Sequence, residues 1–319
     1  MSTHLALDIG GTKISAALVE LPGDGAPPVV RGLTTGPTPA ADGADAVLAA
    51  AVRLARSALT ASAAERGAAA DSPRPIDSIG VASAGVIDLE HGTVLAATDS
   101  LPGWTGTDIA GRLRADLGAP AHVLNDVHAH GLGEALFGAG AAHPSLLLLA
   151  VGTGIGGALV EDGEIRTGAR GVAGHVGHIP CPGADGVLCP CGRSGHLEGW
   201  ASGPGIFARY RREGGSALST AEIAQQAEHG SALARTVLED AGLATGRALG
   251  GLLNVLDPAV VAVTGGVSGA GSLWWDALLD GVGRDAMDAV AATPVVLAQA
   301  GTSAALLGAA AHAARRTQA

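Results

Sequence analysis

A turn rich in glycine and threonine, set between two apolar strands, occurs twice in this sequence, and this repeat constrains the fold more than any other feature. The first copy is LDIGGTKISAALVE at 7–20, and the second is AVGTGIGGALVEDG at 150–163. Each copy predicts a strand, a tight turn and a second strand that ends in Ala-Leu-Val-Glu. Such a coarse internal repeat favours two lobes that each offer one turn to a shared ligand.

Apolar strands alternate with Ala- and Leu-rich helical stretches along the rest of the chain. In the first half we expect strands at 27–33, 76–83 and 121–126, and helices at 42–67, at 107–117 and from 127 to about 137. In the second half, a mainly helical region at 203–254 precedes a strand, a helix, a strand and a final helix. This alternation predicts the α/β class.

Charge and cysteine content limit the possible partners and compartment. The 319 residues carry a formal net charge of −11, which argues against a nucleic-acid-binding surface, because clustered Lys and Arg bind phosphate backbones. Three cysteines are too few for a disulfide scaffold, so we expect a reduced, cytoplasmic setting. The N-terminus lacks a basic segment and glycines interrupt the apolar run at 145–160, so we expect neither a secretory leader nor a membrane span.

The first glycine turn has the composition of a phosphate-binding loop. Gly10 and Gly11 allow backbone N–H groups to approach an anion, and Thr12 adds a hydroxyl. Lys13 is the only lysine of the chain and supplies a positive charge. Asp8 could bind Mg²⁺ directly or through water. The spacing of a Walker A loop is absent, so the turn predicts phosphate binding of another kind.

Two further turns repeat this chemistry. The second turn contains Gly152, Thr153 and Gly154, and a third turn, which follows an apolar strand, contains Gly265 and Gly266. Any one of these is more often a tight turn without a ligand. The three in this order favour a nucleotide as the ligand.

Together with other motifs, these turns make the sequence resemble the ROK sugar kinases along nearly its whole length. The motifs that carry the resemblance are DIGGTK at 8–13, SAGVID at 83–88, LPGW at 101–104, ND at 125–126, GTGIGG at 152–157, GVAGHVGH at 171–178, CPCGRSGHLE at 189–198 and TGG at 264–266. The resemblance implies an actin-like (RNase H-like) ATPase fold with two lobes around a cleft, and ATP and Mg²⁺ as ligands. It also implies a small lobe of 1–122 completed by 301–319, and a large lobe of 123–300 with a zinc-binding loop.

The resemblance assigns the sugar site and the catalytic base. Asp126 would accept the proton of the attacking hydroxyl, as phosphoryl transfer requires. Asn125, Glu198 and Gly85 would contact the sugar, and Ser100 stands where the family often has a sugar-binding Asn. The alternatives are a helix N-cap role for Asp126, an exposed helix-start role for Glu198 and a plain turn for Gly85.

A cluster of histidine and cysteine implies structural zinc. His178, Cys189 and Cys191 match ligands of the family's zinc site, and His196 stands where the family has a fourth cysteine. Zinc accepts two Cys and two His in tetrahedral geometry. Cys181 is a rival for the fourth position, and a loop without metal is the remaining alternative.

His175 narrows the expected substrate. It occupies the position of a family glutamate that binds sugar hydroxyls, and AGHVGH resembles the form found in bacterial N-acetylmannosamine kinases; His178 would touch the sugar as well. The resemblance therefore implies phosphorylation of N-acetyl-D-mannosamine at the 6-hydroxyl by a cytoplasmic homodimer. The alternatives are an N-acetylglucosamine kinase or glucokinase, a non-catalytic sugar sensor and an actin-like filament protein, and drift at a tolerant position would also explain His175.

Overall fold

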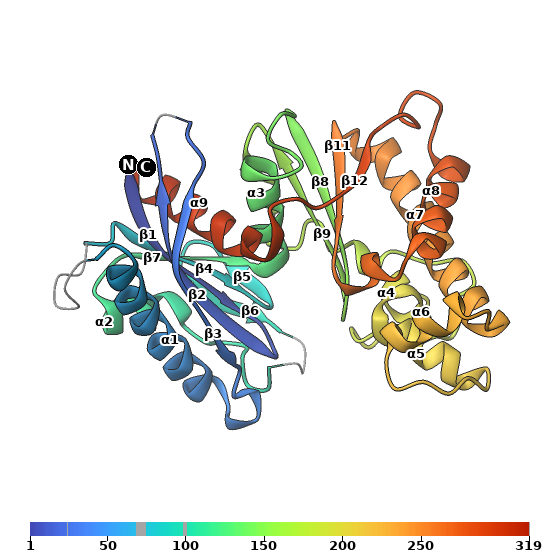
Figure 1. Cartoon of the computed structure of the whole chain (residues 1–319), viewed down its shortest axis with the longest axis horizontal. Coiled ribbons are helices and arrows are strands. Elements are labelled where there is room, and N and C mark those ends of the chain that lie inside the picture. The colour runs from blue at the N-terminus through green and yellow to red at the C-terminus, as the bar shows by residue number, and fades with distance from the viewer. Residues whose placement is uncertain (24, 68–74, 98–100, 319) are drawn as a thin grey trace. The chain divides into compact units, whose positions relative to one another are not determined.

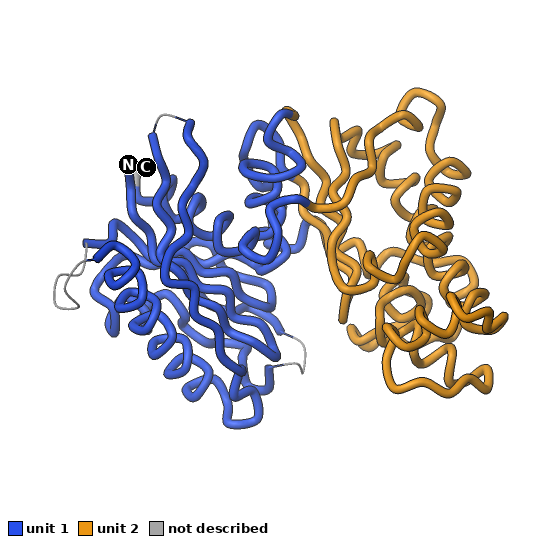
Figure 2. The backbone as a smooth tube through the Cα atoms, in the orientation of Figure 1, with its two compact units in different colours: residues 1–142, 160–173, 299–319 blue, residues 143–159, 174–298 orange. Residues whose placement is uncertain are grey.

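The described part of the chain packs as two compact units. The computed structural model describes residues 1–23, 25–67, 75–97 and 101–318. Figure 2 colours the two units, of which unit 1 comprises 1–142, 160–173 and 299–319, and unit 2 comprises 143–159 and 174–298. Each unit has its own sheet and hydrophobic core, so each is treated by itself.

The sheet of unit 1 brings the ends of its parallel strands to one edge. Its strands, in spatial order, are β3 (Val29–Pro37), β2 (Lys13–Leu21), β1 (Ser2–Ile9), β4 (Ser78–Ser83) and β7 (Ala121–Asn125). β1 runs antiparallel to β2 and parallel to β4, with Ile9 opposite Ser83, and β4 runs parallel to β7, with Ser83 opposite Asn125. The loops after these three residues therefore begin side by side, where ligand sites of α/β sheets commonly lie.

Side-chain size along the strands decides which helices cover each face of this sheet. In β1, Leu5 and Leu7 belong to one core cluster, and Ala6 between them belongs to another, as the two-residue period of a strand requires. The large side chains pack under α1 (Ala44–Glu65) and α2 (Ile109–Leu117). The small ones allow α9 (Ala304–Gln318), drawn in red in Figure 1, to approach the opposite face of the sheet. A Cβ at Gly80 would lie 2.2 Å from the Ala309 carbonyl oxygen.

Helix α1 is long and apolar enough to cross a membrane by length and composition alone. Its mean hydropathy is 1.3, and half of its most apolar stretch is buried inside the protein. Val47, Ala51 and Ala55 lie one helical turn apart and are buried in the core of unit 1. The apolar composition of α1 is therefore that of a core helix, because its apolar side chains pack in the core of unit 1.

Helix α3 (Asp126–Phe137) is held against α9 by close glycine contacts. A Cβ at Gly308 would lie 1.8 Å from the carbonyl oxygen of Ala129, and one at Gly133 would lie 2.0 Å from that of Ala304. Glycine is therefore required at both positions of this helix pair. Because α3 packs on α9, it belongs to unit 1, although the small lobe predicted from the sequence ends at residue 122. The lobe boundaries and the cleft stay predictions.

A fully buried glutamate fastens the returning C-terminal segment to α3. Glu134 accepts hydrogen bonds from the backbone N–H of Ala139 at 3.0 Å, of Gln299 at 2.9 Å and of Ala300 at 2.7 Å. Backbone N–H groups satisfy this side chain where water does not reach it. Unit 1 is therefore completed by chain that comes after the whole of unit 2.

Part of unit 1 has no counterpart in the sequence-based prediction. Strands β5 (Val86–Asp88) and β6 (Thr93–Ala96) form a short antiparallel hairpin directly after the SAGVID motif. The structure also contains the 3₁₀ segment η1 (Ala40–Asp42) just before α1. The hairpin strands are too short to give a clear alternating pattern.

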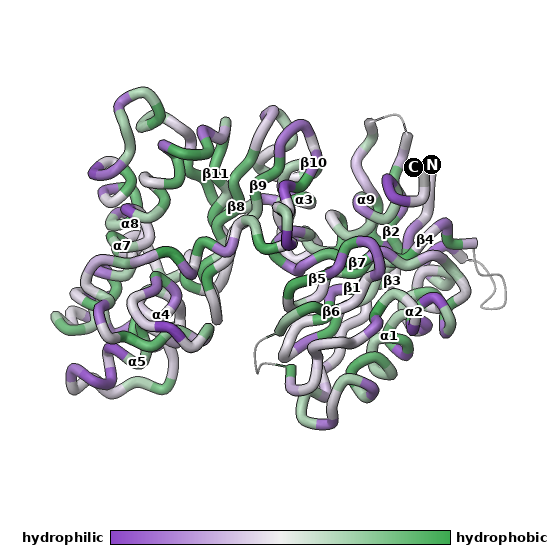
Figure 3. The backbone as a smooth tube through the Cα atoms, turned by 180° about the vertical axis from the view of Figure 1, so that it is seen from behind, coloured by the Kyte–Doolittle hydropathy of each residue, from purple (hydrophilic) through white to green (hydrophobic). Residues whose placement is uncertain are grey.

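Unit 2 repeats the strand–turn–strand arrangement in a second sheet. The order of strands in that sheet is β10 (Glu164–Ile165), β9 (Ile155–Glu161), β8 (Ser145–Val151), β11 (Val260–Thr264) and β12 (Val295–Leu297), and the boundary between the units falls within β9. β11 runs parallel to β8 and to β12. Figure 3 shows β8 and β11 as largely hydrophobic, as expected of strands buried on both faces.

Helices form most of the remainder of unit 2. They are α4 (Leu197–Ala201), α5 (Gly203–Arg212), α6 (Thr220–Glu228), α7 (Ala232–Leu256) and α8 (Ser272–Asp285), with the 3₁₀ segments η2 (Val176–His178) and η3 (Gly266–Gly269); η4 (Gly301–Ser303) precedes α9 in unit 1. The α/β class and the helical character of 203–254 agree with the prediction. The region 163–200, for which no helix or strand was predicted, contains the short elements β10, η2 and α4.

Candidate functional site

The first glycine turn of unit 1 connects β1 to β2 and is fixed by backbone contacts. The Gly10 N–H donates to the Lys13 carbonyl at 3.0 Å, and the Thr38 hydroxyl donates to the Gly10 carbonyl at 2.7 Å. Thr12 accepts a hydrogen bond from the backbone N–H of Thr38 at 3.0 Å through its carbonyl. The side chains of Thr12 and Lys13 are exposed, so both are available to a ligand.

Asp8 lies at the end of β1 in a setting that favours its protonated form. The pKa of Asp8 is raised to about 6, chiefly by burial and also by the nearby charge of Asp126, against the lowering effect of Lys13. A dication bound at this carboxylate would favour the ionised form instead. Asp8, the predicted Mg²⁺-binding residue, and Asp126, the predicted base, therefore lie close enough within unit 1 for their negative charges to repel each other.

Asn125 and Asp126 stand at the junction of β7 and α3. The Asn125 side-chain oxygen accepts from the N–H groups of Val127 and His128, so Asn125 is the N-cap of α3. Its Nδ2 donates to the Gly85 carbonyl at 3.0 Å and to Asp126 Oδ1 at 2.9 Å. The structure therefore brings together three of the residues that the resemblance assigns to the sugar and the base, and it gives the N-cap role to Asn125 instead of Asp126.

Gly85 is required at its position by the backbone. Its φ is +102°, and a Cβ there would lie 2.7 Å from the Ala96 carbonyl oxygen. A plain turn and a sugar contact are both compatible with this geometry. Ser100, the other predicted sugar contact of this unit, lies outside the described residues.

A buried tryptophan holds the loop that contains Gly85. Trp104 Nε1–H donates to the Ser83 hydroxyl and to the Ala84 carbonyl, each at 3.2 Å. Trp104 is 1% exposed, so the LPGW motif supplies a rigid support under the loop. The motif marks this residue in the sequence, but its hydrogen-bond partners become evident only in the fold.

The second and third glycine turns lie together on a cavity of unit 2. The cavity has a volume of about 820 Å³, within the usual range for small-molecule sites. Its lining includes Gly152 and Thr153 of the second turn, Gly266 of the third turn, and Phe207, Gln225 and Glu228 of α5 and α6. The sequence-based assignment found the turns but missed the helix residues, because no local pattern marks them.

Gly265 and Gly154 do not line this cavity but allow its turns to form. Gly265 has a φ of +96°, and a Cβ there would lie 2.3 Å from the Val151 carbonyl oxygen. A Cβ at Gly154 would lie 2.7 Å from Glu198 Oε2. Both glycines therefore permit close approach of the chain, and their contact with phosphate stays a prediction.

The four predicted metal ligands of unit 2 form one cluster. The ligand atoms of His178, Cys189, Cys191 and His196 all lie within 4.8 Å of one another. Cys189 Sγ is 3.4 Å from His178 Nδ1, and Cys191 Sγ is 3.2 Å from His196 Nδ1. Tetrahedral zinc with its usual bond lengths would place such ligand atoms roughly 3.3–3.8 Å apart, so the cluster fits zinc after a small contraction.

The state of His178 also suits metal binding. Burial lowers the pKa of His178; the charge of Glu198 raises it, and the neighbouring His175 and His196 lower it. The neutral imidazole is the form that binds a metal. The His178 ring lies 5.6 Å from that of His196 and 6.1 Å from that of His175.

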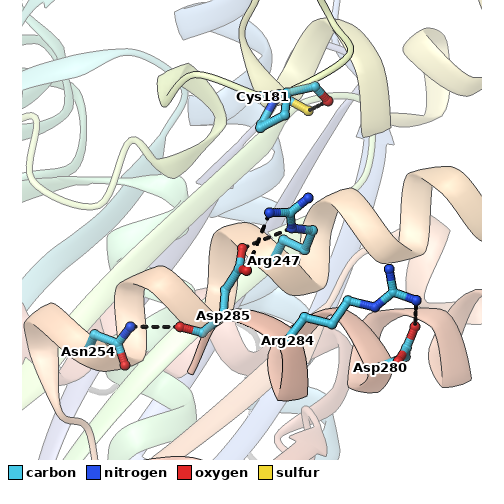
Figure 4. Close-up of polar contacts among 7 residues, drawn as sticks. Cys181, Arg247, Asn254, Asp280, Arg284 and Asp285 are labelled. Carbon is cyan, nitrogen blue, oxygen red and sulfur yellow. Dashed lines mark hydrogen bonds and ion pairs between the residues drawn. The ribbon is translucent and has the colours of Figure 1, made fainter. Parts of the chain in front are cut away.

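Cys181 is not part of this cluster. Its buried Sγ lies 3.7 Å from the Pro182 carbonyl oxygen, and burial raises the pKa of its thiol to about 11, against the lowering effect of Arg247. Figure 4 shows Cys181 apart from the ion pair of Arg247 and Asp285, where Arg247 Nε donates to Asp285 Oδ2 at 2.9 Å. The geometry therefore groups His196, and not Cys181, with the other three.

The predicted sugar residues of unit 2 flank the metal cluster. His175 immediately precedes η2, which contains His178, and its side chain is partly exposed. Glu198 is in α4, two residues after His196, and is 9% exposed. Its Oε2 accepts a hydrogen bond from the Ile155 N–H at 2.7 Å. Glu198 is thus a buried residue with a backbone partner, which the alternative of an exposed helix start does not describe.

Comparison with known proteins shows the relatives of the chain. The family model described as the ROK family matches residues 4–316. The glucokinase of Halalkalibacterium halodurans is 33% identical over 208 residues, which cover 60% of this chain and 62% of that protein. The bifunctional enzyme NanE/NanK of Brucella melitensis is 32% identical over 308 residues, which cover 96% of this chain and 53% of that protein. The chain therefore spans about half the length of that bifunctional relative.

A solved structure resembles the whole chain. The ROK family glucokinase from Streptomyces griseus, in complex with glucose and AMPPNP, has a TM-score of 0.78 and 28% identity, and the match covers 98% of this chain and all of that one. The predicted α/β, actin-like ATPase fold is confirmed by this likeness and by the family match.

Proposed function

The chain belongs to the ROK family, and from this premise we propose that it is an ATP-dependent sugar kinase that phosphorylates N-acetyl-D-mannosamine at the 6-hydroxyl. The observation that carries the proposal is the junction of β7 and α3, where Asn125 and Asp126 are hydrogen-bonded to each other beside Gly85. A carboxylate fixed at the end of a parallel strand, next to a phosphate-type turn, is suited to phosphoryl transfer.

In this proposal Asp126 accepts the proton of the sugar hydroxyl while the hydroxyl oxygen attacks the γ-phosphorus of ATP and ADP leaves. Oδ1 of Asp126 accepts from Asn125 Nδ2 and from the Val127 N–H at 3.0 Å, so the carboxylate has a defined orientation. Such orientation, rather than covalent chemistry, is what the protein supplies to this reaction. Asn125 and Gly85 would contact the sugar from the same junction.

The phosphate turns and the cavity of unit 2 would bind the nucleotide. The cavity of about 820 Å³ would hold the nucleoside, and Gly152, Thr153 and Gly266 at its wall would face the phosphates. In unit 1, the turn of Gly10, Gly11 and Thr12 with Lys13 would bind the transferred phosphoryl group, and Mg²⁺ bound near Asp8 would neutralise phosphate charge. The S. griseus relative is the precedent for ATP-analogue binding on this fold.

His175 and Glu198 support the choice of sugar. Each would contact sugar hydroxyls in unit 2, and an imidazole can both accept and donate a hydrogen bond where a glutamate carboxylate only accepts. The resemblance of AGHVGH to bacterial N-acetylmannosamine kinases supports N-acetylmannosamine as substrate, and the H. halodurans glucokinase favours glucose as the alternative. An N-acetylglucosamine or glucose kinase is therefore the second candidate.

Turnover of a sugar panel tests the activity. ADP release should be fastest, by kcat/KM, with N-acetyl-D-mannosamine among that sugar, N-acetyl-D-glucosamine, glucose and mannose. A His175→Glu variant should shift the preference towards glucose, and His175→Gln, a matched neutral change, should shift it less. A preference for glucose in the unaltered protein would overturn the substrate assignment, and absence of turnover with every sugar would overturn the kinase assignment.

We also propose that His178, Cys189, Cys191 and His196 hold one structural zinc ion. A closed four-ligand site has no open position for water, so zinc would brace the loop between η2 and α4 instead of joining the chemistry. Metal analysis of the purified protein should find about one zinc per chain, which Cys189→Ser loses. The matched variant Cys181→Ser should keep its zinc; loss there, with retention in His196→Ala, would make Cys181 the fourth ligand.

The setting of the protein follows from the proposed reaction. We propose a cytoplasmic enzyme, because ATP and the reduced thiols of the zinc site are maintained there. We propose a homodimer as well, which sedimentation of the purified protein would distinguish from a monomer. The product, N-acetylmannosamine 6-phosphate, would serve sialic acid metabolism.

A further inference from the structure

Helix α4 in unit 2 is fastened at both ends to the second glycine turn. At one end, Glu198 Oε2 accepts the Ile155 N–H at 2.7 Å. Just beyond the other end, the Gly203 N–H donates to the Gly152 carbonyl at 2.8 Å. The turn of 152–154 is therefore joined to the α4 segment by two hydrogen bonds, one at Gly152, the first residue of the turn, and one at Ile155, just after its last.

This connection joins two regions with different proposed ligands. His196, a member of the metal cluster, immediately precedes α4, and the loop before it contains His175. On the other side, Gly152, Thr153 and Gly203 line the cavity proposed for the nucleotide. All of these contacts lie within unit 2. Glu198 is thus hydrogen-bonded to the residue that follows the turn, and Gly152 and Thr153 of the turn form part of the cavity wall.

Close packing makes the connection rigid. Glu198 is 9% exposed, and the Gly154 Cα approaches so closely that a Cβ there would lie 2.7 Å from Oε2. A buried carboxylate that loses a hydrogen-bond partner is costly, so the carboxylate and the Ile155 N–H should move together. An apolar side chain at position 198 could fill the same space, but it could not accept the hydrogen bond of the Ile155 N–H.

We propose that Glu198 couples sugar binding to nucleotide binding: one carboxylate oxygen holds the 152–155 turn through Ile155, and a sugar bound at the same carboxylate fixes that turn in its phosphate-binding position. The inference rests on the proposed function for the presence of a sugar at Glu198. It adds a role for Glu198 as a positioning residue of the phosphate turn. Because coupling is reciprocal, the nucleotide would tighten sugar binding by the same factor.

Calorimetry measures this coupling directly. The dissociation constant of Mg²⁺–AMPPNP is determined without sugar and with N-acetyl-D-mannosamine or glucose, each at ten or more times its own dissociation constant for the variant tested. In the unaltered protein, saturating sugar should tighten AMPPNP binding about fivefold or more. In Glu198→Ala the factor should fall to about one, whereas Glu198→Gln should keep most of it, because the amide oxygen still accepts the Ile155 N–H.

Controls separate coupling from a structural role. Glu239→Ala removes a glutamate from the surface of α7, where it pairs with Arg235 at 3.6 Å, and should leave the factor unchanged. If Glu198 had only a structural role, its loss would lower the stability of the protein and its affinities for sugar and for AMPPNP. The factor by which sugar tightens AMPPNP binding would then stay unchanged. If Glu198→Ala does not fold, Glu198→Asp, which withdraws the carboxylate by one methylene group, should reduce the factor relative to Glu198→Gln.

Hydrogen exchange of the turn provides a second readout. Sugar should slow amide exchange in a peptide covering 150–157 of the unaltered protein, and this protection should be lost in Glu198→Ala. Sugar that binds without changing either AMPPNP affinity or this protection would overturn the coupling and leave the kinase assignment intact. Nucleotide binding with no binding of either sugar would overturn the substrate assignment and the coupling together.

Discussion

The two glycine turns that form the internal repeat have similar sequences but different surroundings. The turn at 10–12 is flanked by Asp8 and Lys13 and is held by backbone and Thr38 contacts. The turn at 152–154 has no charged residue of its own and is held by the buried Glu198. In the first turn the charges are in the repeat itself, whereas in the second turn the charge is supplied by a distant segment.

This difference shows that the two turns share a backbone path but differ in the side chains that could act on a ligand. The strand–turn–strand pattern specifies where the chain reverses, and it does so in both units. The neighbours then decide what each turn can do: the first lies near Asp126, and the second lies on the nucleotide-sized cavity. We therefore expect the first turn to govern the chemical step and the second to govern nucleotide affinity.

The largest effect is expected at the base that faces the first turn. Asp126→Asn should lower kcat by about 10²–10⁴-fold, because an amide cannot accept the proton of the hydroxyl. The hydrogen bonds to Oδ1 remain possible for an asparagine, so the melting temperature should change little. Steady-state ADP release measures kcat, and a near-normal kcat would remove Asp126 from the role of base.

Removing one proposed ligand-binding side chain from each turn compares the two turns directly. Lys13→Met should lower kcat by about 10²-fold, because the positive charge stabilises the transferred phosphoryl group. Thr153→Ala in the second turn should mainly raise the KM for ATP, by less than about tenfold. Equal effects of the two changes on kcat would contradict the division of roles between the turns.

A methyl group added to each turn tests how each is supported. In Gly154→Ala the new Cβ meets Glu198 Oε2 at 2.7 Å, whereas in Gly10→Ala it meets the Lys13 carbonyl oxygen at 3.3 Å. We expect Gly154→Ala to weaken AMPPNP binding on the order of tenfold, and Gly10→Ala to weaken it less. Fluorescence titration with AMPPNP gives both values. If Gly10→Ala weakened AMPPNP binding more than Gly154→Ala did, the Glu198 side chain would be able to move away from the new methyl group, and it would not hold the second turn rigidly.

The smallest effect concerns the stability of the ligand-free protein. The raised pKa of Asp8 means that the folded protein binds this proton more tightly than the unfolded chain does. The stability that this proton contributes is present below about pH 4 and is lost as the pH rises through about 6. Asp8→Asn should therefore raise the melting temperature at pH 8 by about 2 °C and change it little at pH 4. An equal shift at both pH values would contradict the raised pKa.

Local patterns predicted the turns and the ends of the strands that lead to the candidate site, whereas the strand expected at 27–33 lies at Val29–Pro37. The Asn125–Asp126 pair and the glycines at 10–11 and 152–154 follow from strands that stop at polar residues, a signal contained in a few neighbouring positions. The resemblance to the family's zinc site predicted the cluster but left Cys181 and His196 open as candidates for the fourth ligand. Only the path of the loop, which brings His196 into the cluster and leaves Cys181 outside it, distinguishes them.

Contacts between distant segments could not be predicted in this way. Phe207 and Glu228 line the nucleotide-sized cavity because α5 and α6 fold over the second turn, and neither belongs to a motif. The contact of Glu198 with Ile155 joins positions 43 residues apart. Such contacts depend on packing, which a single sequence does not encode in any local period.

The fastening of α3 by α9 and by the segment at 299–300 has a consequence for biosynthesis. A nascent chain emerges from its N-terminus, and its domains fold as they become complete. All of unit 2 leaves the ribosome before residue 299, whereas α3 meets its glycine-lined partner α9 only afterwards. The helix that begins with Asp126 is therefore among the last parts to reach its final packing, and a truncated or stalled product would have the nucleotide-sized cavity without a correctly seated base.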